Sequence, residues 1–341
     1  MKHIVEEWHQ NICDSALWAF YFSDMRTGAL DIETTGLDPS RNKFILGGIY
    51  DGQSHRLHQI LAENRKEEPE ALAEYMDVLA DLDVVITYNG RHFDIPFIDT
   101  RLKKHSMTST LSCSYLYDLD LYQVLRGYSP IRCFVPNLKQ KTVEDYMGLW
   151  ETRTDEISGA ESVDLYNHYE ATADPDAESK ILLHNNDDVR QLTRLTKAIT
   201  KSDFHKAMFS IGFPIKYGPM MVTVNGIRIC RDRLEFHGEQ NRLPVRYMGF
   251  ERKGWPVSSR FTGESFEMSV PIIRQGGLTV IDLEAAALSD ETAAGSSGLR
   301  FEDYPGCASG FLVIEDENGI QYRETNHFIK AFTKQFMEEI I

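Results

Sequence analysis

The spacing of hydrophobic and polar positions changes once along the chain, near residue 202. From about Gly28 to Lys201, short apolar runs alternate with longer amphipathic ones. This alternation is typical of α/β structures, in which helices cover the faces of a sheet. We therefore expect a first domain over residues 1–201 that contains a mixed sheet flanked by helices.

After Ser202, apolar and polar residues alternate over short stretches, as they do in half-buried antiparallel strands. The stretches cover residues 221–230, 233–237, 265–270, 278–283 and 311–323. Between alternating runs stand the dipeptides Asn225-Gly226 and Asn318-Gly319, which favour hairpin turns. We expect a smaller, mostly antiparallel β domain over residues 202–341.

Two further features complete this second region. A helix over about residues 326–341 places four apolar side chains on one face, those of Phe328, Ala331, Phe332 and Phe336. A stretch rich in Ser and Gly over residues 289–298 is expected to be a loop. The second domain therefore ends in a helix.

Composition restricts the class of protein. The 341 residues are 42% hydrophobic and 26% charged, the mix of a folded globular chain. No apolar run approaches the roughly 20 residues of a membrane span, and the amino end lacks the basic start of a secretory signal. The five cysteines form no C-x-x-C pair, which argues against a zinc knuckle or a disulfide framework. We expect a cytoplasmic protein with reduced thiols and no membrane partner.

Charge is unevenly distributed. The chain has a net charge of −16, and its first 200 residues hold 20 basic and 33 acidic side chains. Residues 201–274 hold 12 basic and 7 acidic side chains, which is the only sizeable segment with a positive balance. Since proteins that bind polyanions are usually basic somewhere, this segment is a candidate contact for nucleic acid.

Asp31 and Glu33 are the first candidate site residues. They lie in Thr27-Gly-Ala-Leu-Asp-Ile-Glu-Thr-Thr-Gly-Leu37, and residues two apart in a strand project from the same face. Two adjacent carboxylates repel each other unless a cation lies between them, and oxygen ligands favour Mg²⁺ or Mn²⁺. The alternative is a solvated strand edge, which such a short pattern also fits.

Asp94 follows a second strand pattern. A β-branched run after Asp83 ends in the turn Tyr88-Asn-Gly90, and Asp94 comes four residues later. An acid just past the carboxyl end of a strand lies where α/β folds build their sites. The alternative is that Asp94 caps the helix that follows.

His184 and Asp188 lie one turn apart in a predicted helix over residues 182–195. This spacing places an imidazole beside a carboxylate on one face, as a site that binds metal and accepts a proton from water requires. The alternative is a surface ion pair. Asp187 is the competing acid, interpreted as solvent-facing or as a support for the ligands.

Taken together, these segments resemble the DEDD superfamily of 3′ to 5′ exonucleases, whose ribonuclease H-like fold presents four carboxylates to two metal ions. Asp31-Ile-Glu-Thr-Thr-Gly-Leu37, Tyr88-Asn-Gly-Arg-His-Phe-Asp94 and His184-Asn-Asn-Asp-Asp188 are similar to its three motifs. The stretch Asn137-Leu-Lys-Gln-Lys-Thr-Val-Glu-Asp-Tyr-Met-Gly148 with His184-Asn185 is similar to the YprB-like branch. The resemblance covers about 170 residues, roughly half of the chain.

The resemblance implies that Asp31, Glu33, Asp94 and Asp188 bind two Mg²⁺ or Mn²⁺ ions. It places His184 where relatives carry a Tyr or His that orients or deprotonates the attacking water. In the His-type relatives the spacing from His to Asp is one residue longer than here, whereas the Tyr-type spacing is equal, so the role of His184 as a base stays open. One ion then activates water and the other stabilises the leaving 3′ oxygen.

Substrate contacts are expected beside the acids. The candidates that line or approach the motifs are Thr34, Asn89, Phe93 and Lys139. Further candidates for phosphate contacts are Lys141 and the basic run Arg101, Lys103 and Lys104, although charged side chains on the outer face of a helix are usually only solvated.

The predicted function is a metal-dependent 3′ to 5′ exonuclease acting on single-stranded ends of DNA or RNA. The alternatives are a catalytically silent nucleic-acid-binding or adaptor protein on the same fold, and an endonucleolytic ribonuclease H that cleaves hybrids. A pure binding module has no use for four crowded carboxylates, which favours the enzyme. Neither the sugar of the substrate nor any protein partner follows from the sequence.

Overall fold

The computed structural model describes residues 1–107, 112–149, 153–154, 157, 159–288, 300–305 and 307–341. The predicted loop over residues 289–298 lies outside these ranges. The chain divides into two compact units. The first unit comprises Met1–Ser15 and Met25–Ser202, and the second comprises Ala16–Asp24 and Asp203–Ile341. The short segment from Ala16 to Asp24 therefore belongs with the carboxyl-terminal part of the chain.

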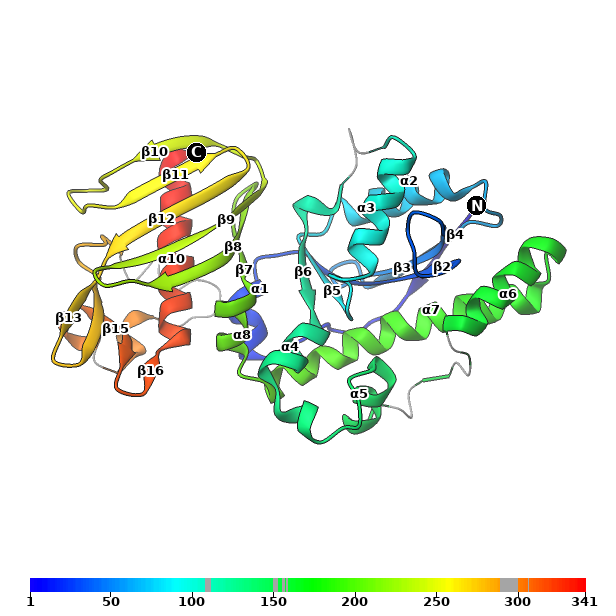
Figure 1. The fold of residues 1–341 in the computed structure, drawn as a ribbon, viewed down its shortest axis with the longest axis horizontal. Coiled ribbons are helices and arrows are strands. Elements are labelled where there is room, and N and C mark those ends of the chain that lie inside the picture. The colour runs from blue at the N-terminus through cyan, green and yellow to red at the C-terminus, as the bar shows by residue number, and fades with distance from the viewer. Residues whose placement is uncertain (108–111, 150–152, 155–156, 158, 289–299, 306) are drawn as a thin grey trace. The chain divides into compact units, whose positions relative to one another are not determined.

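The first unit contains a six-stranded mixed sheet in the order β1-β4-β3-β2-β5-β6 (Figure 1). The strands are β1 (Lys2–Glu7), β2 (Thr27–Thr34), β3 (Phe44–Asp51), β4 (Arg56–Leu61), β5 (Val84–Thr87) and β6 (Tyr117–Asp120). Neighbouring strands from β1 to β2 in this order pair antiparallel. Strand β5 pairs parallel with β2, and β6 pairs parallel with β5. The carboxyl ends of β2 and β5 therefore meet at one edge of the sheet.

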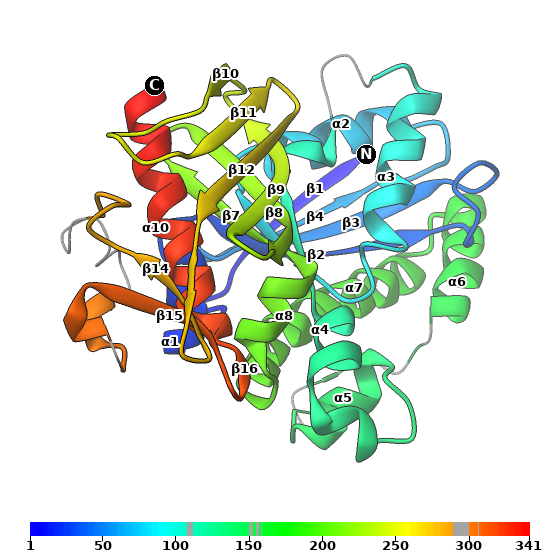
Figure 2. The same cartoon turned by 60° about the vertical axis from the view of Figure 1, so that its left-hand side comes forward.

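Helices cover both faces of this sheet, with α2 and α3 on one side and α7 on the other in both views (Figures 1 and 2). The helices are α2 (Glu68–Leu79), α3 (Asp94–Lys104), α4 (Leu121–Tyr128), α5 (Gln140–Tyr146), α6 (Gly159–Thr172) and α7 (Pro175–Leu195). Because β5 lies between two parallel neighbours and under helices, its four residues are all buried and all β-branched.

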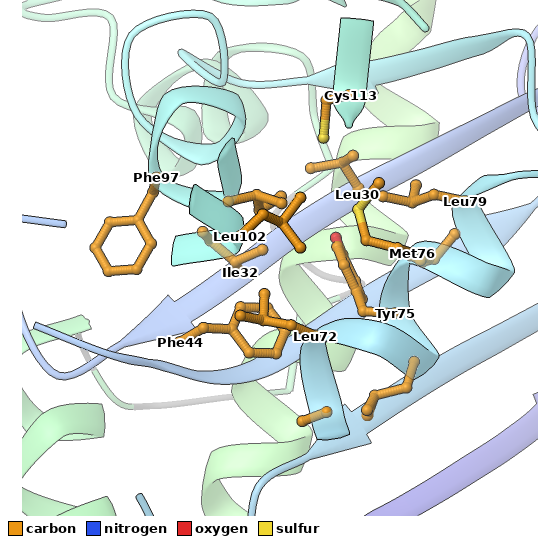
Figure 3. Packing of buried hydrophobic residues seen from close by; sticks show 14 of the residues in the cluster. Leu30, Ile32, Phe44, Leu72, Tyr75, Met76, Leu79, Phe97, Leu102 and Cys113 are labelled. Atoms are coloured by element: carbon orange, nitrogen blue, oxygen red, sulfur yellow. The ribbon is translucent and has the colours of Figure 1, made fainter. Parts of the chain in front are cut away.

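The main core lies between β2 and the helices α2 and α3 (Figure 3). Leu30 and Ile32 of β2 contribute to it, and so do Leu72, Tyr75, Met76 and Leu79 of α2 and Phe97 and Leu102 of α3. Since strand residues alternate between faces, the side chains of Asp31 and Glu33 project from the opposite face, toward α7. A second cluster, with Ile45, Leu61, Tyr166 and Ile181, packs α6 and α7 against that face.

The second unit is built from two antiparallel sheets and helices. One sheet has the order β10-β11-β12-β9-β8-β7 and the other β13-β14-β15-β16. The strands are β7 (Phe213–Tyr217), β8 (Met220–Ile229), β9 (Arg233–Arg242), β10 (Arg246–Gly249), β11 (Ser258–Thr262), β12 (Ser265–Pro271), β13 (Ile273–Gln275), β14 (Leu278–Asp282), β15 (Phe311–Asp316) and β16 (Gly319–Ile320). The helices are α1 (Ala16–Phe22), α8 (Phe204–Ile211) and α10 (Tyr322–Ile340).

These elements confirm the predicted architecture: a mixed sheet flanked by helices, followed by antiparallel sheets and a carboxyl-terminal helix. All four side chains predicted for the apolar face of α10 are buried. A hairpin joins β15 and β16 as expected, but its two turn residues are Glu317 and Asn318, because Gly319 already pairs with Asp316.

The hairpin predicted at Asn225-Gly226 is wrong. Both residues lie inside β8, and the pairing with β9 shifts its register between Val224 and Gly226, which is the signature of a β-bulge. A Cβ atom at Gly226 would lie 2.4 Å from the ring of His237, so the glycine lets this ring pack against the bulge. The chain turns later, where the amide of Cys230 donates to the carbonyl of Arg233.

No helix among the residues described here combines the length and apolarity that crossing a bilayer requires.

Lys330 of α10 gives the second unit a pH-dependent stability. Its buried ammonium donates to the backbone carbonyls of Phe20 and Tyr21 at the end of α1. Burial lowers the pKa of Lys330 to about 7, with Lys334 lowering it further and Asp24 opposing the shift. Between pH 7 and the ordinary value of 10.5, the unfolded chain therefore binds one more proton than the folded chain, so folding becomes more favourable as the pH rises.

We expect this contribution to disappear in Lys330→Met. Between pH 7 and pH 9, the unfolding free energy of the wild type should rise relative to that of Lys330→Met by up to about 2.7 kcal/mol, at about 1.4 kcal/mol per pH unit. Equilibrium unfolding of both proteins in guanidinium, at each of the two pH values, measures this difference in unfolding free energy. A difference between the two proteins that stays constant with pH would contradict the assignment.

Candidate active site

Asp31 and Glu33 lie on one face of β2, as predicted. Glu33 is buried, whereas Asp31 keeps part of its surface in an open groove. Gly48 of β3 is the pairing partner of Asp31, and a Cβ atom there would lie 2.3 Å from Oδ1 of Asn185. The glycine therefore lets helix α7 approach the strand that carries the two acids. The solvated strand edge is excluded as an interpretation of this pair.

Asp94 is the first residue of α3, directly after the turn that ends β5. The residue at the N-cap position is Phe93, so the interpretation of Asp94 as the cap is wrong. The carboxylate instead reaches β2, where the amide of Ile32, between the other two acids, donates to Oδ1 at 3.3 Å. This contact brings the second motif to the first.

Asp120, which no sequence pattern indicated, holds the turn before Asp94. Asn89 has a positive φ of 65°, and its amide donates to Oδ1 of Asp120 at 2.8 Å. The next residue in the turn is a glycine, Gly90, because a Cβ atom there would lie 2.4 Å from the Cβ atom of Thr87. The structure thus gives Asn89 a part in the turn and does not place it in the lining of the groove.

His184 and Asp188 of α7 complete the cluster. Nε2 of His184 lies 3.6 Å from Oε1 of Glu33 and 3.5 Å from Oδ2 of Asp188. His184 is only 3% exposed, so a surface ion pair is excluded. Among the described residues, Glu33, His184 and Asp188 each offer one ligand atom, and these atoms all lie within 4.8 Å of one another.

Asn185 connects α7 to Asp31, a contact absent from our sequence predictions. Its Nδ2 donates to Oδ2 of Asp31 at 3.1 Å and to the carbonyl of Asp31 at 3.2 Å. Its Oδ1 accepts from Nε2 of Gln59 at 3.1 Å. The adjacent glycines Gly47 and Gly48 inside a strand pattern were the available signal, since they often mark a close approach of another element.

A buried arginine holds Asp188 from the other side. Arg153 donates through Nε and Nη2 to both oxygens of Glu144 at 3.0 Å, and its Nη2 lies 2.5 Å from Oδ1 of Asp188. The neighbouring Thr154 donates to Oδ2 of Asp187, which is buried. Asp187 is therefore not solvent-facing, and it anchors the segment that carries Arg153.

Burial and crowding perturb the protonation of Asp31, Glu33 and Asp94. Burial, followed by repulsion from Asp188, Asp94 and Glu33, raises the pKa of Asp31 well above its usual range. Burial raises the pKa of Glu33 to about 7 against the opposing influence of His184, and burial also raises the pKa of Asp94 to about 7. A set of buried carboxylates beside one imidazole fits divalent cations, because positive charge between the acids removes the repulsion.

Three of the acids, Asp31, Glu33 and Asp188, line an open groove of about 870 Å³ together with His184, whereas Asp94 is not part of this lining. Thr34, Phe93 and Lys139, predicted as substrate contacts, also line it, although the hydroxyl of Thr34 donates to the carbonyl of Gly36. Leu37 lies in the lining with 81% of its surface exposed. The groove thus places an exposed apolar side chain and a lysine beside the carboxylates.

Arg101 does not contact this groove as a phosphate ligand would. Its guanidinium is buried and donates to both oxygens of Glu68 at 2.6 Å. The prediction that Arg101 touches substrate is therefore wrong, because its guanidinium is buried, is neutralised by Glu68 of α2 and also donates to the carbonyl of Pro39.

Part of the chain is similar to known proteins. A model of the RNase H superfamily matches residues 29–200. DNA polymerase 1 of Sulfurisphaera ohwakuensis is 35% identical over 51 residues, which are 15% of this chain and 6% of that protein. The family B DNA polymerase of Pyrobaculum calidifontis aligns in structure with 22% identity and a TM-score of 0.42 over 51% of this chain and 24% of that chain. The chain thus matches only a small part of either polymerase.

Proposed function

Because the chain belongs to the RNase H superfamily, we propose that it is a metal-dependent 3′ to 5′ exonuclease of the YprB-like branch, acting on single-stranded DNA or RNA ends. The observation that carries this proposal is the convergence of four acids from three separate segments. Asp31, Glu33 and Asp188 line one groove, and Asp94 accepts from the amide of Ile32, which lies between Asp31 and Glu33. A fold that needed only to bind a polyanion gains nothing from crowding carboxylates such as Asp31, Glu33 and Asp94, whose pKa values are raised by burial and by repulsion from neighbouring acids.

In this proposal the four carboxylates hold two Mg²⁺ or Mn²⁺ ions. The ions, when bound, supply Lewis acidity for water activation and neutralise charge on the phosphate. The chain orients the ligands: Asn185 holds Asp31, and Arg153 holds one oxygen of Asp188 while the other faces His184. We propose that His184 accepts a proton or orients water at the edge of the cluster, and the distances from its Nε2 to Glu33 and Asp188 support this role.

The preference for an unpaired end rests on the groove lining. Leu37 and the half-buried ring of Phe93 present apolar surface beside the carboxylates, against which an unstacked terminal base packs. Lys139 lies in the same lining and provides positive charge for a phosphate. We assign this chemistry to residues 1–201 without the segment Ala16–Asp24, and we propose that residues 202–341 together with that segment form a separate β-rich domain. We also propose a cytoplasmic location.

The proposal is tested with linear and circular single strands incubated with Mn²⁺ or Mg²⁺, and with a chelator as control. We expect linear DNA or RNA to be shortened, circular strands to stay intact, and all hydrolysis to stop in chelator. Cleavage of circles or of hybrid duplexes would favour an endonuclease instead. Binding to every substrate without hydrolysis would favour the catalytically silent alternative.

A further inference from the structure

A basic stretch free of acids borders the groove. From Leu121 to Val143 the chain contains four basic residues and no acidic one, in contrast to the acid excess over the first 200 residues. The stretch covers α4, the short 3₁₀ turn η2 (Pro130–Cys133) and the start of α5. Arg126, Arg132 and Lys139 are exposed, and none of the three forms an ion pair with a carboxylate in the described part of the chain. Their charge is available to a polyanion.

Two exposed aromatic side chains lie within and just after this stretch. Phe134 is 67% exposed and Tyr146 is 47% exposed. Their ring planes lie within 15° of parallel, with 6.4 Å between the centroids. An aromatic pair left to solvent with aligned ring faces is the arrangement on which successive bases of a single strand stack.

Helix α5 connects this pair to the active site. Lys139, Gln140 and Lys141 at its start line the groove of the carboxylates, and Tyr146 is its last residue. Seven helical residues span about 10 Å. A strand whose end lies among the carboxylates therefore reaches the aromatic pair within a few nucleotides.

We propose that Phe134 and Tyr146, with Arg126 and Arg132, form a docking platform for the part of a single-stranded nucleic acid that lies outside the active site. The rings stack on bases, the arginines contact phosphates, and Lys139 continues the phosphate path into the groove. This inference rests on the proposed function, since it assigns the substrate of that site a path across the protein.

The test measures binding of a fluorescein-labelled 20-nucleotide single strand by anisotropy, in the full chain carrying Asp31→Asn so that the strand stays intact. We expect the added pair Phe134→Ala/Tyr146→Ala to raise the Kd about tenfold or more, because stacking contributes on that scale for each base. The pair Arg126→Gln/Arg132→Gln should reduce the slope of log K against log salt by about 1.4, roughly 0.7 for each phosphate contact.

Matched variants separate docking from structural damage. Phe250→Ala removes another exposed phenylalanine, on the second unit, and Lys66→Gln/Lys180→Gln removes two other exposed charges. Both should leave the Kd and the salt slope unchanged. The variant Phe134→Ala/Tyr146→Ala should raise the Kd and leave the salt slope unchanged. A general folding defect would change both quantities. An unchanged Kd in Phe134→Ala/Tyr146→Ala, or a loss in Phe250→Ala instead, would overturn the proposal.

A parallel nuclease assay of the wild type distinguishes this inference from the proposed function. If the wild type does not shorten single strands but Phe134→Ala/Tyr146→Ala weakens binding, the proposed exonuclease function is wrong and the docking platform is supported. If the wild type shortens single strands and Phe134→Ala/Tyr146→Ala binds them normally, the docking platform is wrong and the proposed exonuclease function is supported.

Discussion

Asp31→Asn is expected to reduce strand hydrolysis by at least about 10³-fold while leaving the fold intact. The substitution keeps the shape of the side chain and an oxygen that can accept from Nδ2 of Asn185. It removes one of the four charges that hold the cations, and losing about 4 kcal/mol of transition-state stabilisation corresponds to this factor. Initial rates on a labelled single strand with Mn²⁺ measure the effect.

The same variant should be at least as thermally stable as the wild type in chelator. Desolvation and repulsion from three neighbouring acids raise the pKa of Asp31, so a neutral amide at this position relieves repulsion. Millimolar Mn²⁺ should raise the Tm of the wild type more than that of Asp31→Asn, because a ligand stabilises only the folded state that binds it. The exposed Asp77→Asn on α2 is the control and should behave as the wild type in both assays. Equal Mn²⁺-induced shifts in Asp31→Asn and the wild type would contradict the assignment of Asp31 as a ligand.

Arg101→Met is expected to destabilise the chain by about 3–5 kcal/mol at pH 7, because it leaves the buried carboxylate of Glu68 without its main partner. Nη1 of Arg101 also donates to the carbonyl of Pro39, in the loop that follows Leu37. The loss should therefore loosen one wall of the groove as well as the packing of α2 on α3. Equilibrium unfolding in guanidinium measures the free energy.

The double variant Glu68→Met/Arg101→Met is the matched control. Replacing a buried ion pair by apolar side chains of similar volume is often close to neutral, so the double variant should be more stable than Arg101→Met alone. Burial by itself raises the pKa of Glu68, but the hydrogen bonds from Arg101 and His105 lower it below its ordinary value of 4.5. The ion pair between Glu68 and Arg101 therefore stabilises the fold above pH 4.5, and this stabilisation is lost as the pH falls below 4.5. A cost below about 1 kcal/mol for Arg101→Met would contradict this account.

The sequence predicts the elements that local patterns determine. The β-branched residues of β5, the alternation in β2 and the apolar face of α10 are each visible within a few neighbouring positions. The two-residue period of a strand also predicts that Asp31 and Glu33 share one face of β2. The period of a helix predicts in the same way that His184 and Asp188 share one face of α7. Whether these residues meet depends on strand order, and the resemblance of three ordered motifs indicated that they do.

Contacts between distant segments are the part that sequence patterns did not reveal. Arg101 looks like a surface cation until Glu68, 33 residues earlier, is seen beside it. Arg153 lies 35 residues from Asp188, and the segment from Ala16 to Asp24 joins a unit whose remaining residues begin at Asp203. Asn225-Gly226 has the composition of a turn, but pairing with β9 uses the glycine for a bulge. Each case depends on a partner that periodicity does not identify.

The most direct test of the proposed activity is degradation of one 20-nucleotide single strand labelled at either end, as DNA and as RNA, with Mn²⁺. We predict that the 5′-labelled strand gives a ladder that shortens with time, that the 3′-labelled strand releases a labelled mononucleotide at once, and that Asp31→Asn gives neither. A ladder from the 3′-labelled strand with immediate release of the 5′ label would contradict the polarity. Intact strands in every reaction would contradict the proposal that this site is an exonuclease.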